Sequence, residues 1–273
     1  MWVRLKRNKL AILGLFLVVS LVLVALFAEV IAPYDPVQIA LKNSLEEPNS
    51  AHLMGTDVLG RDIFSRIIYG ARASLIIGVV ATSISLVIGV TIGAISGYYG
   101  GWLDALMMRI TDIFFAFPFF LLAIAIMTFL GASFINIFIA LGIVGWTNYA
   151  RLVRGQVISV KESEYVEAAR AVGAKDARII LKHILPNTLT PVIVYTTMNI
   201  GVVILAEAGL SFLGIGVRPP SPSWGLMLAE GKDFLFNASW LVIWPGIAIF
   251  LTVLGYNLLG EGLRDALDPR LKP

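Results

Sequence analysis

Long apolar runs alternate with short polar segments along the whole chain. They lie near residues 10–31, 74–97, 113–130, 134–150, 189–215 and 238–260. A helix needs about 20 mostly apolar residues to cross the hydrocarbon core of a bilayer, so the pattern predicts six membrane-spanning helices. Only the turn Gly131-Ala132-Ser133 separates the third from the fourth, and a re-entrant pair is the alternative there. The first run is longer than the about 7–15 apolar residues of a signal peptide, which favours an uncleaved anchor.

The composition agrees with a chain that lies mostly in lipid. Hydrophobic residues make up 58% of the 273 residues and charged residues 14%, against roughly 45–50% and about 25% in soluble domains. We therefore expect an all-α polytopic membrane protein. Its parts are an N-terminal anchor helix with an extracytoplasmic segment (1–73) and a five-helix core (74–273) that contains a cytoplasmic loop at 150–188. The chain has no cysteine, which excludes disulfides and thiolate metal ligands.

Lysine and arginine predict the orientation, because cytoplasmic loops carry an excess of them. If the N-terminus is cytoplasmic, fifteen of the 21 cationic residues face the cytoplasm and six face the other side. Seven of the fifteen lie between Arg151 and Lys182, and one is Arg109. The others lie near the termini, at Arg4, Lys6, Arg7, Lys9, Arg264, Arg270 and Lys272. Both termini and the segment after Arg151 are thus expected in the cytoplasm.

The longest charged segment, Glu164–Pro186, has the pattern of two short amphipathic helices joined at Gly173. The first has an apolar stripe at i, i+3, i+4 and i+7, formed by Tyr165, Ala168, Ala169 and Val172. The stripe of the second is formed by Ala177, Ile180, Leu181 and Ile184. Asp176 is a candidate cap for this helix, and Pro186 is expected to end it.

The same segment resembles the EAA loop of permease subunits in binding-protein-dependent ABC importers. The matching motifs are Glu167-Ala168-Ala169, then Gly173, then Ile184-Leu185-Pro186. In that family the loop docks into a groove on the ATPase, so the resemblance implies a type I ABC importer permease fold with a cytoplasmic coupling loop. It assigns to coupling the residues Glu164, Glu167, Ala168, Ala169, Arg170, Gly173, Ile184 and Pro186. From periodicity alone, an amphipathic loop on the membrane surface is the alternative.

A polar segment with mixed charges precedes the second apolar run. Gly55 and Gly60 allow tight turns, and Asp62 and Arg66 are spaced for an i, i+4 ion pair. The string GTDVLGRDIFSRIIYGARASL resembles the second permease of the dipeptide, oligopeptide and nickel importers. Its signature residues are Gly55, Thr56, Asp57, Gly60, Arg61, Asp62 and Arg66. They either stabilise this extracytoplasmic segment or contact substrate or binding protein. No metal site is expected, because the arginines can satisfy both aspartates.

The fifth run holds the polar residues expected to line a translocation pathway. At a rise of about 1.5 Å per residue from Leu189, Asn199 lies near the midplane, close to Thr196, and Glu207 lies near the outer face. An ionisable residue in a membrane span is a functional hypothesis. For Glu207, an interfacial position or a hydrogen bond to nearby backbone is the alternative.

Two further patterns concern packing of the predicted spans. Small residues recur every four positions in the second run, at Ala81, Ser85, Gly89, Gly93 and Gly97, which predicts close contact with another helix. Pro118 is expected to kink the third span.

Several absences narrow the function. The chain has no GxxxxGK[ST] phosphate loop, so we expect no catalytic residue and no cofactor in it, with ATP and Mg²⁺ bound by partner ATPases. There is no HExxH motif and no histidine in a predicted span, which argues against an intramembrane protease. A secondary transporter is a remote alternative, because Glu207 is the only candidate for its ionisable residue.

The resemblance therefore implies a permease subunit that imports dipeptides or oligopeptides, with nickel or a nickel chelate as the alternative solute. The implied partners are a homologous second permease, two ABC ATPase subunits and an extracytoplasmic solute-binding protein. The implied location is the cytoplasmic membrane of a prokaryote, with lipid around the chain. Nucleic acid is not an expected partner.

Overall fold

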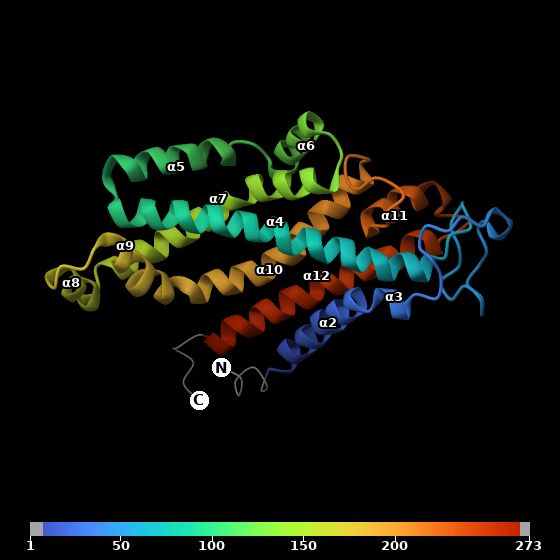
Figure 1. Cartoon of the computed structure of the whole chain (residues 1–273), viewed down its shortest axis with the longest axis horizontal. Coiled ribbons are helices and arrows are strands. Elements are labelled where there is room, and N and C mark those ends of the chain that lie inside the picture. Colours follow the sequence, from blue (N-terminus) through green and yellow to red (C-terminus); the bar gives the residue numbers. More distant parts are fainter. Residues whose placement is uncertain (1–7, 268–273) are drawn as a thin grey trace.

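The computed structural model describes residues 8–267 and is built almost entirely of helices (Figure 1). The α-helices are α2 (Lys9–Leu26), α3 (Ala28–Ile31), α4 (Ile63–Tyr99), α5 (Gly101–Phe115), α6 (Phe119–Leu130), α7 (Phe134–Lys161), α8 (Glu164–Ala171), α9 (Asp176–Ile179), α10 (Leu185–Phe212), α11 (Trp224–Gly231) and α12 (Trp240–Leu267). Short 3-10 turns lie at Leu41–Asn43 and Lys232–Phe234, and one π-helical turn lies at Ile180–Ile184. The predicted all-helical architecture is confirmed.

Length and hydropathy support four or five membrane spans within the described part of the chain. Four helices are long and apolar enough: α2, α4, α12 and the continuous stretch Asp176–Phe212, which includes α10. The bent pair α5 and α6 is a fifth candidate. Helix α7 has 28 residues but is not among them. Asn136 and Asn148 interrupt its apolar part, and Arg151 follows. The predicted count of six spans is thus not confirmed.

The third predicted span, 113–130, is wrong as a single helix. Helix α5 begins earlier, at Gly101, and the axis turns by 87° between α5 and α6. Pro118 stands at the N-cap of α6 with φ −57° and ψ 130°. Proline disfavours the helical region for the residue before it, here Phe117, so α5 ends at Phe115 and a new helix begins at Phe119. The expected kink at Pro118 is therefore a complete break.

Helices α4 and α7 pack along most of their length (Figure 1). A Cβ atom added at Gly89 would lie 2.5 Å from the backbone oxygen of Trp146, and one at Gly93 would lie 2.5 Å from that of Ala150. Only glycine permits so close an approach of the two backbones. The packing role predicted for the small-residue stripe is confirmed at these two positions.

The polar segments gather at opposite ends of the long axis (Figure 1). Helices α8 and α9 form one end. Residues 32–62 together with α11, which we call the cap, form the other. Helix α2 lies beside α12, and Asn8 both caps α2 and donates a hydrogen bond to Asp265 (3.0 Å). Five residues of the orientation argument, Arg4, Lys6, Arg7, Arg270 and Lys272, lie outside the described residues.

Candidate functional site

Helices α8 and α9 form a hairpin around Gly173, as predicted. Gly173 has φ +78°, a left-handed conformation that glycine adopts at little cost. The second helix does not end at Pro186, however. Leu185 is helical (φ −56°, ψ −43°), and the chain continues from α9 through the π-helical turn into α10. The wider π turn just before Pro186 accommodates a residue that lacks an N–H, so the predicted stop is wrong.

The predicted apolar stripe of α8 is wrong in its direction. The buried residues of α8 are Val166 and Ala169. Tyr165 is 45% exposed, Val172 is 84% exposed, and Ala168 is exposed as well. Val166 was not part of the predicted stripe but is buried. Of the four predicted stripe residues, only Ala169 is buried with it. Together with Leu181 on the π-helical turn (65% exposed), Tyr165, Ala168 and Val172 form an exposed apolar set, which we call the tip face.

The inner side of the hairpin is held firmly against α4 and α7. Val166, Ala169, Ile179 and Ile184 belong to one apolar cluster with Tyr98 of α4 and two valines of α7, Val153 and Val157. The Tyr98 hydroxyl donates to Asp176 Oδ1 (2.8 Å), and the Arg170 guanidinium lies 5.4 Å from the Tyr98 ring centre. Asp176 is therefore not the cap of α9, whose N-cap position is Lys175.

The remaining predicted coupling residues divide between the two sides of the hairpin. Glu164, Glu167, Arg170 and Pro186 are exposed, whereas Ile184 is buried. Sequence reasoning did not identify Tyr98. The signal was weak, because Tyr98 precedes its partners by more than 70 residues and stands in the Tyr98-Tyr99 pair at the end of an apolar run.

A groove of about 480 Å³ runs between α4 and α10. Thr196 and Thr197 line it together with apolar side chains such as Val87 and Val90. Thr196 Oγ1 donates to the Val192 carbonyl (2.7 Å), so its hydroxyl is satisfied within α10. Asn199 is half-buried and lies one turn beyond the groove. Of the pathway residues predicted on α10, Thr196 lines the groove and Asn199 does not.

Glu207 lies away from this groove. It is completely buried, and one carboxylate oxygen accepts a hydrogen bond from Ser211 Oγ (2.7 Å). The other oxygen has no hydrogen-bond partner in residues 8–267. The tight approach of Gly225 of α11 to Ala208 closes this end of α10. The local hydrogen bond expected as the alternative is present, although its donor is a side chain.

The signature residues of the cap are buried, and their charged side chains are held by one another and by His52, Ser65 and Glu230. Gly55 (φ +77°) and Gly60 (φ +73°) form the predicted turns. Asp62 caps α4: its Oδ2 accepts from the Ser65 N–H and hydroxyl, at 2.7 Å each. Its Oδ1 lies 2.9 Å from His52 Nδ1. The predicted ion pair between Asp62 and Arg66 is wrong, because Asp62 is already satisfied as a helix cap.

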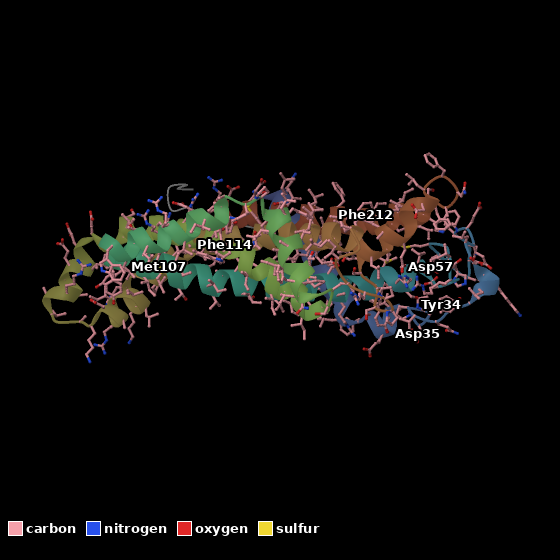
Figure 2. The ribbon with its side chains drawn as sticks, turned by 90° about the horizontal axis from the view of Figure 1, so that it is seen from above. Tyr34, Asp35, Asp57, Met107, Phe114 and Phe212 are labelled. Carbon is pink, nitrogen blue, oxygen red and sulfur yellow. The ribbon has the colours of Figure 1, made fainter. Side chains whose placement is uncertain are left out.

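Arg66 pairs with a residue distant in sequence. Its guanidinium donates to Glu230 of α11 (2.8 Å) and lies 3.7 Å from Asp57, and its side chain is completely buried. Arg61 bridges the same two carboxylates, at 2.5 Å from Asp57 and 2.9 Å from Glu230. Figure 2 shows Asp57 at one end of the molecule, with Met107 of α5 towards the other. Glu230, which the sequence did not suggest, joins the signature segment to α11.

Two family profiles match the chain. The first, described as "Binding-protein-dependent transport system inner membrane component", matches residues 89–273. The second, described as "N-terminal TM domain of oligopeptide transport permease C", matches residues 1–48. The resemblance seen in the sequence is thus confirmed over most of the chain.

Relatives and solved structures agree with this family. The chain is 49% identical to a dipeptide transport system permease, DppC of Alkalihalophilus pseudofirmus, over 98% of the chain and 88% of that protein. It is 45% identical to a glutathione transport system permease, GsiD of Pectobacterium atrosepticum, over 99% and 90%.

Among solved structures, the methionine transporter MetNI in an inward-facing conformation superposes with a TM-score of 0.59 at 20% identity. The match covers 76% of this chain and 98% of that one, and shows a shared fold. The two relatives that the chain resembles over nearly its whole length are thus transport system permeases. The chain is a multi-pass membrane protein of the binding-protein-dependent transport family, a permease subunit of an ABC importer.

Proposed function

We propose that this subunit forms half of the translocation pathway for dipeptides or oligopeptides. A homologous permease supplies the other half, two ATPases bind ATP and Mg²⁺ on the cytoplasmic side, and a binding protein delivers solute outside. Both termini lie in the cytoplasm of a prokaryotic cell. The observation that carries the coupling part of the proposal is the exposed tip face, where Val172 is 84% exposed and Leu181 65%.

The hairpin has the two properties that a coupling element needs. Val166, Ile179 and Ile184 are completely buried against α4 and α7, so the hairpin moves with these helices as one body. Val172 and Tyr165 remain exposed at its far side and are flanked by Glu164 and Glu167. An exposed apolar patch with a polar rim is typical of a protein–protein interface. Movement of an ATPase bound there would be transmitted to α4, α7 and, through the π-helical turn, α10.

The groove between α4 and α10 is the proposed lining of the pathway. It is mostly apolar, with Thr91, Thr196 and Thr197 as its hydroxyl-bearing residues. Asn199 lies beyond the groove on the same helix and is proposed to line the next part of the path. Glu207 is buried in this structure, so we do not place it on the pathway. A weakly polar lining suits transient passage of peptides with different side chains.

The peptide class is supported by relatives whose names specify dipeptide and glutathione transport. The direct test is uptake of a labelled dipeptide by cells that lack only this chain and by the same cells after complementation. Unlabelled longer peptides, glutathione and nickel would be added separately as competitors. We expect complementation to restore uptake and peptides to compete. Restored nickel accumulation without dipeptide uptake would contradict the proposal and assign the subunit to nickel import.

A further inference from the structure

A pocket of about 390 Å³ lies at the cap end of the molecule, between α4, the start of α7 and the segment after α10. Arg72 and Arg218 line it, together with the polar residues Tyr69, Ser133 and Ser221, and none of its lining residues is acidic. Its other walls are apolar and include Ile76 and Phe134. The pocket thus combines two positive charges with an apolar wall.

The charges of the two arginines are incompletely neutralised. Arg218 is exposed and forms no ion pair within residues 8–267. Arg72 pairs with Glu29 at 3.1 Å and donates to the backbone carbonyls of Ala25 (3.1 Å) and Leu26 (3.4 Å). The Glu29 side chain is 72% exposed, so solvent weakens the ion pair. Arg61 and Arg66, in contrast, are matched by Asp57 and Glu230. A positive potential therefore remains in the pocket and favours an anionic ligand.

The pocket lies where three elements leave the apolar layer. Arg72 is the last charged residue of α4 before an uncharged stretch that continues to Tyr99. Ser133 directly precedes the uncharged first half of α7, and Arg218 is the first charged residue after buried Glu207 of α10. Tyr69 has the amphipathic ring that is enriched at this depth. The arginines are consequently at the level of lipid head groups, and Ile76 (42% exposed) lies one turn deeper.

We propose that this pocket binds the phosphate head group of an anionic membrane phospholipid. Arg218 contacts the phosphate, Arg72 adds a positive charge beside it, the hydroxyls of Ser133 and Ser221 donate hydrogen bonds to its oxygens, and an acyl chain lies along Ile76. Arginine suits this role because its planar group binds phosphate with two parallel hydrogen bonds. The bound lipid would link α4, α7 and the segment after α10 at one point.

Native mass spectrometry of the purified full chain, mixed with equal amounts of phosphatidylglycerol and phosphatidylethanolamine, tests the proposal. We expect preferential retention of phosphatidylglycerol. One cationic residue near a membrane surface contributes about 1 kcal/mol to the binding of anionic lipid, so Arg218→Gln should weaken retention about fivefold. Lys42→Gln is the matched control, because Lys42 is also an exposed cation on the cap side and does not line the pocket. It should leave retention unchanged.

Arg218→Gln removes no ion pair or side-chain hydrogen bond within residues 8–267, so the variant should fold, and thermal unfolding verifies this. Arg72→Gln provides a second measurement on the opposite wall. Equal retention of both lipids, or unchanged phosphatidylglycerol binding in both arginine variants, would overturn the proposal. So would displacement of phosphatidylglycerol by a free dipeptide but not by its C-terminal amide, since the pocket would then be a peptide carboxylate site.

Discussion

The two ends of this subunit use charged residues in opposite ways. In the cap, Asp57, Arg61, Asp62 and Arg66 are each at most 4% exposed and pair with one another, with His52, with Ser65 and with Glu230. On the α8–α9 hairpin, Glu164, Glu167 and Arg178 are exposed, and so is the apolar tip face. The cap is complete within one chain, whereas the hairpin leaves a surface that another protein can cover. The comparison predicts that mutations act on stability at the cap and on assembly at the hairpin.

The largest effect on stability is expected for Arg66→Ala in the cap. Arg66→Ala leaves Asp57 and Glu230 with Arg61 as their remaining cation, and removing one member of a buried ion-pair network costs up to about 3–5 kcal/mol. Thermal unfolding of the purified full chain in detergent measures this loss. Arg178→Ala on the hairpin is the control, with an expected change within about 0.5 kcal/mol, because Arg178 is exposed. Equal losses of thermal stability in Arg66→Ala and Arg178→Ala would contradict the proposed difference between the cap and the hairpin.

The next largest effect is expected for Ala168→Arg on the tip face. A bulky cation inserted into a docked apolar interface should weaken ATPase binding by about 2 kcal/mol, or roughly thirtyfold. Co-purification of the ATPases and peptide uptake should both fall, while the amount of inserted subunit stays normal. Ala51→Arg, at an exposed alanine of the cap, should leave co-purification unchanged. If Ala168→Arg retains the ATPases, the tip face is not the docking surface.

A charged residue at Ala169 tests a different property. Ala169 is only 8% exposed and packs in the cluster beneath the hairpin, so Ala169→Glu should loosen the hairpin itself. Comparing Ala168→Arg with Ala169→Glu by hydrogen exchange separates docking from local unfolding. Faster exchange in α8 is expected only for the variant at position 169.

A smaller effect is expected at the hairpin turn. A Cβ atom at Gly173 would meet no atom within 4 Å, so Gly173→Ala costs only the left-handed backbone conformation, roughly 1–2 kcal/mol. Amide exchange of α8 should accelerate about tenfold. Gly155 is equally open but lies inside α7, so Gly155→Ala should stabilise by up to about 1 kcal/mol. Destabilisation of similar size in both would show that backbone conformation is not the cause.

The smallest effect is expected for Tyr98→Phe. It removes one hydrogen bond to Asp176 and keeps the ring, at a cost of about 1 kcal/mol. Exchange of α9 amides should accelerate about fivefold, and uptake should decrease slightly. Tyr99→Phe is the matched control, because the neighbouring ring is 53% exposed. If α9 responds to the change at Tyr99 but not to the change at Tyr98, the hydrogen bond from Tyr98 to Asp176 does not hold α9 in place.

The sequence predicted what depends on local pattern. Apolar runs located the main helices, Gly173 located the hairpin turn, and the glycines of α4 predicted its close contact with α7. Each of these features is determined by residues within a few turns of one another. The assignment to the permease family came from motifs, and the relatives support it over nearly the whole chain.

Features that depend on distant partners were missed. The partner of Arg66 is Glu230, 164 residues later, and the partner of Tyr98 is Asp176, 78 residues later. The i, i+4 spacing predicted an ion pair between Asp62 and Arg66. Spacing alone does not show that the Asp62 carboxylate is already used to cap α4. Pro186 was expected to end a helix because α-helical geometry was assumed, whereas a π turn precedes it. Which side of α8 is buried depends on the apolar residues of α4 and α7 that it packs against, and the periodicity of α8 alone gives no information about them.

The bridge between Arg66 and Glu230 also has a consequence for the order of assembly during synthesis. Ribosomes add about 5–20 residues per second, so the 164 residues between the two partners take roughly 10–30 s to be made. Throughout that interval Arg66 has no Glu230 to pair with, and its burial would be costly. The cap can therefore be completed only after α11 has been made.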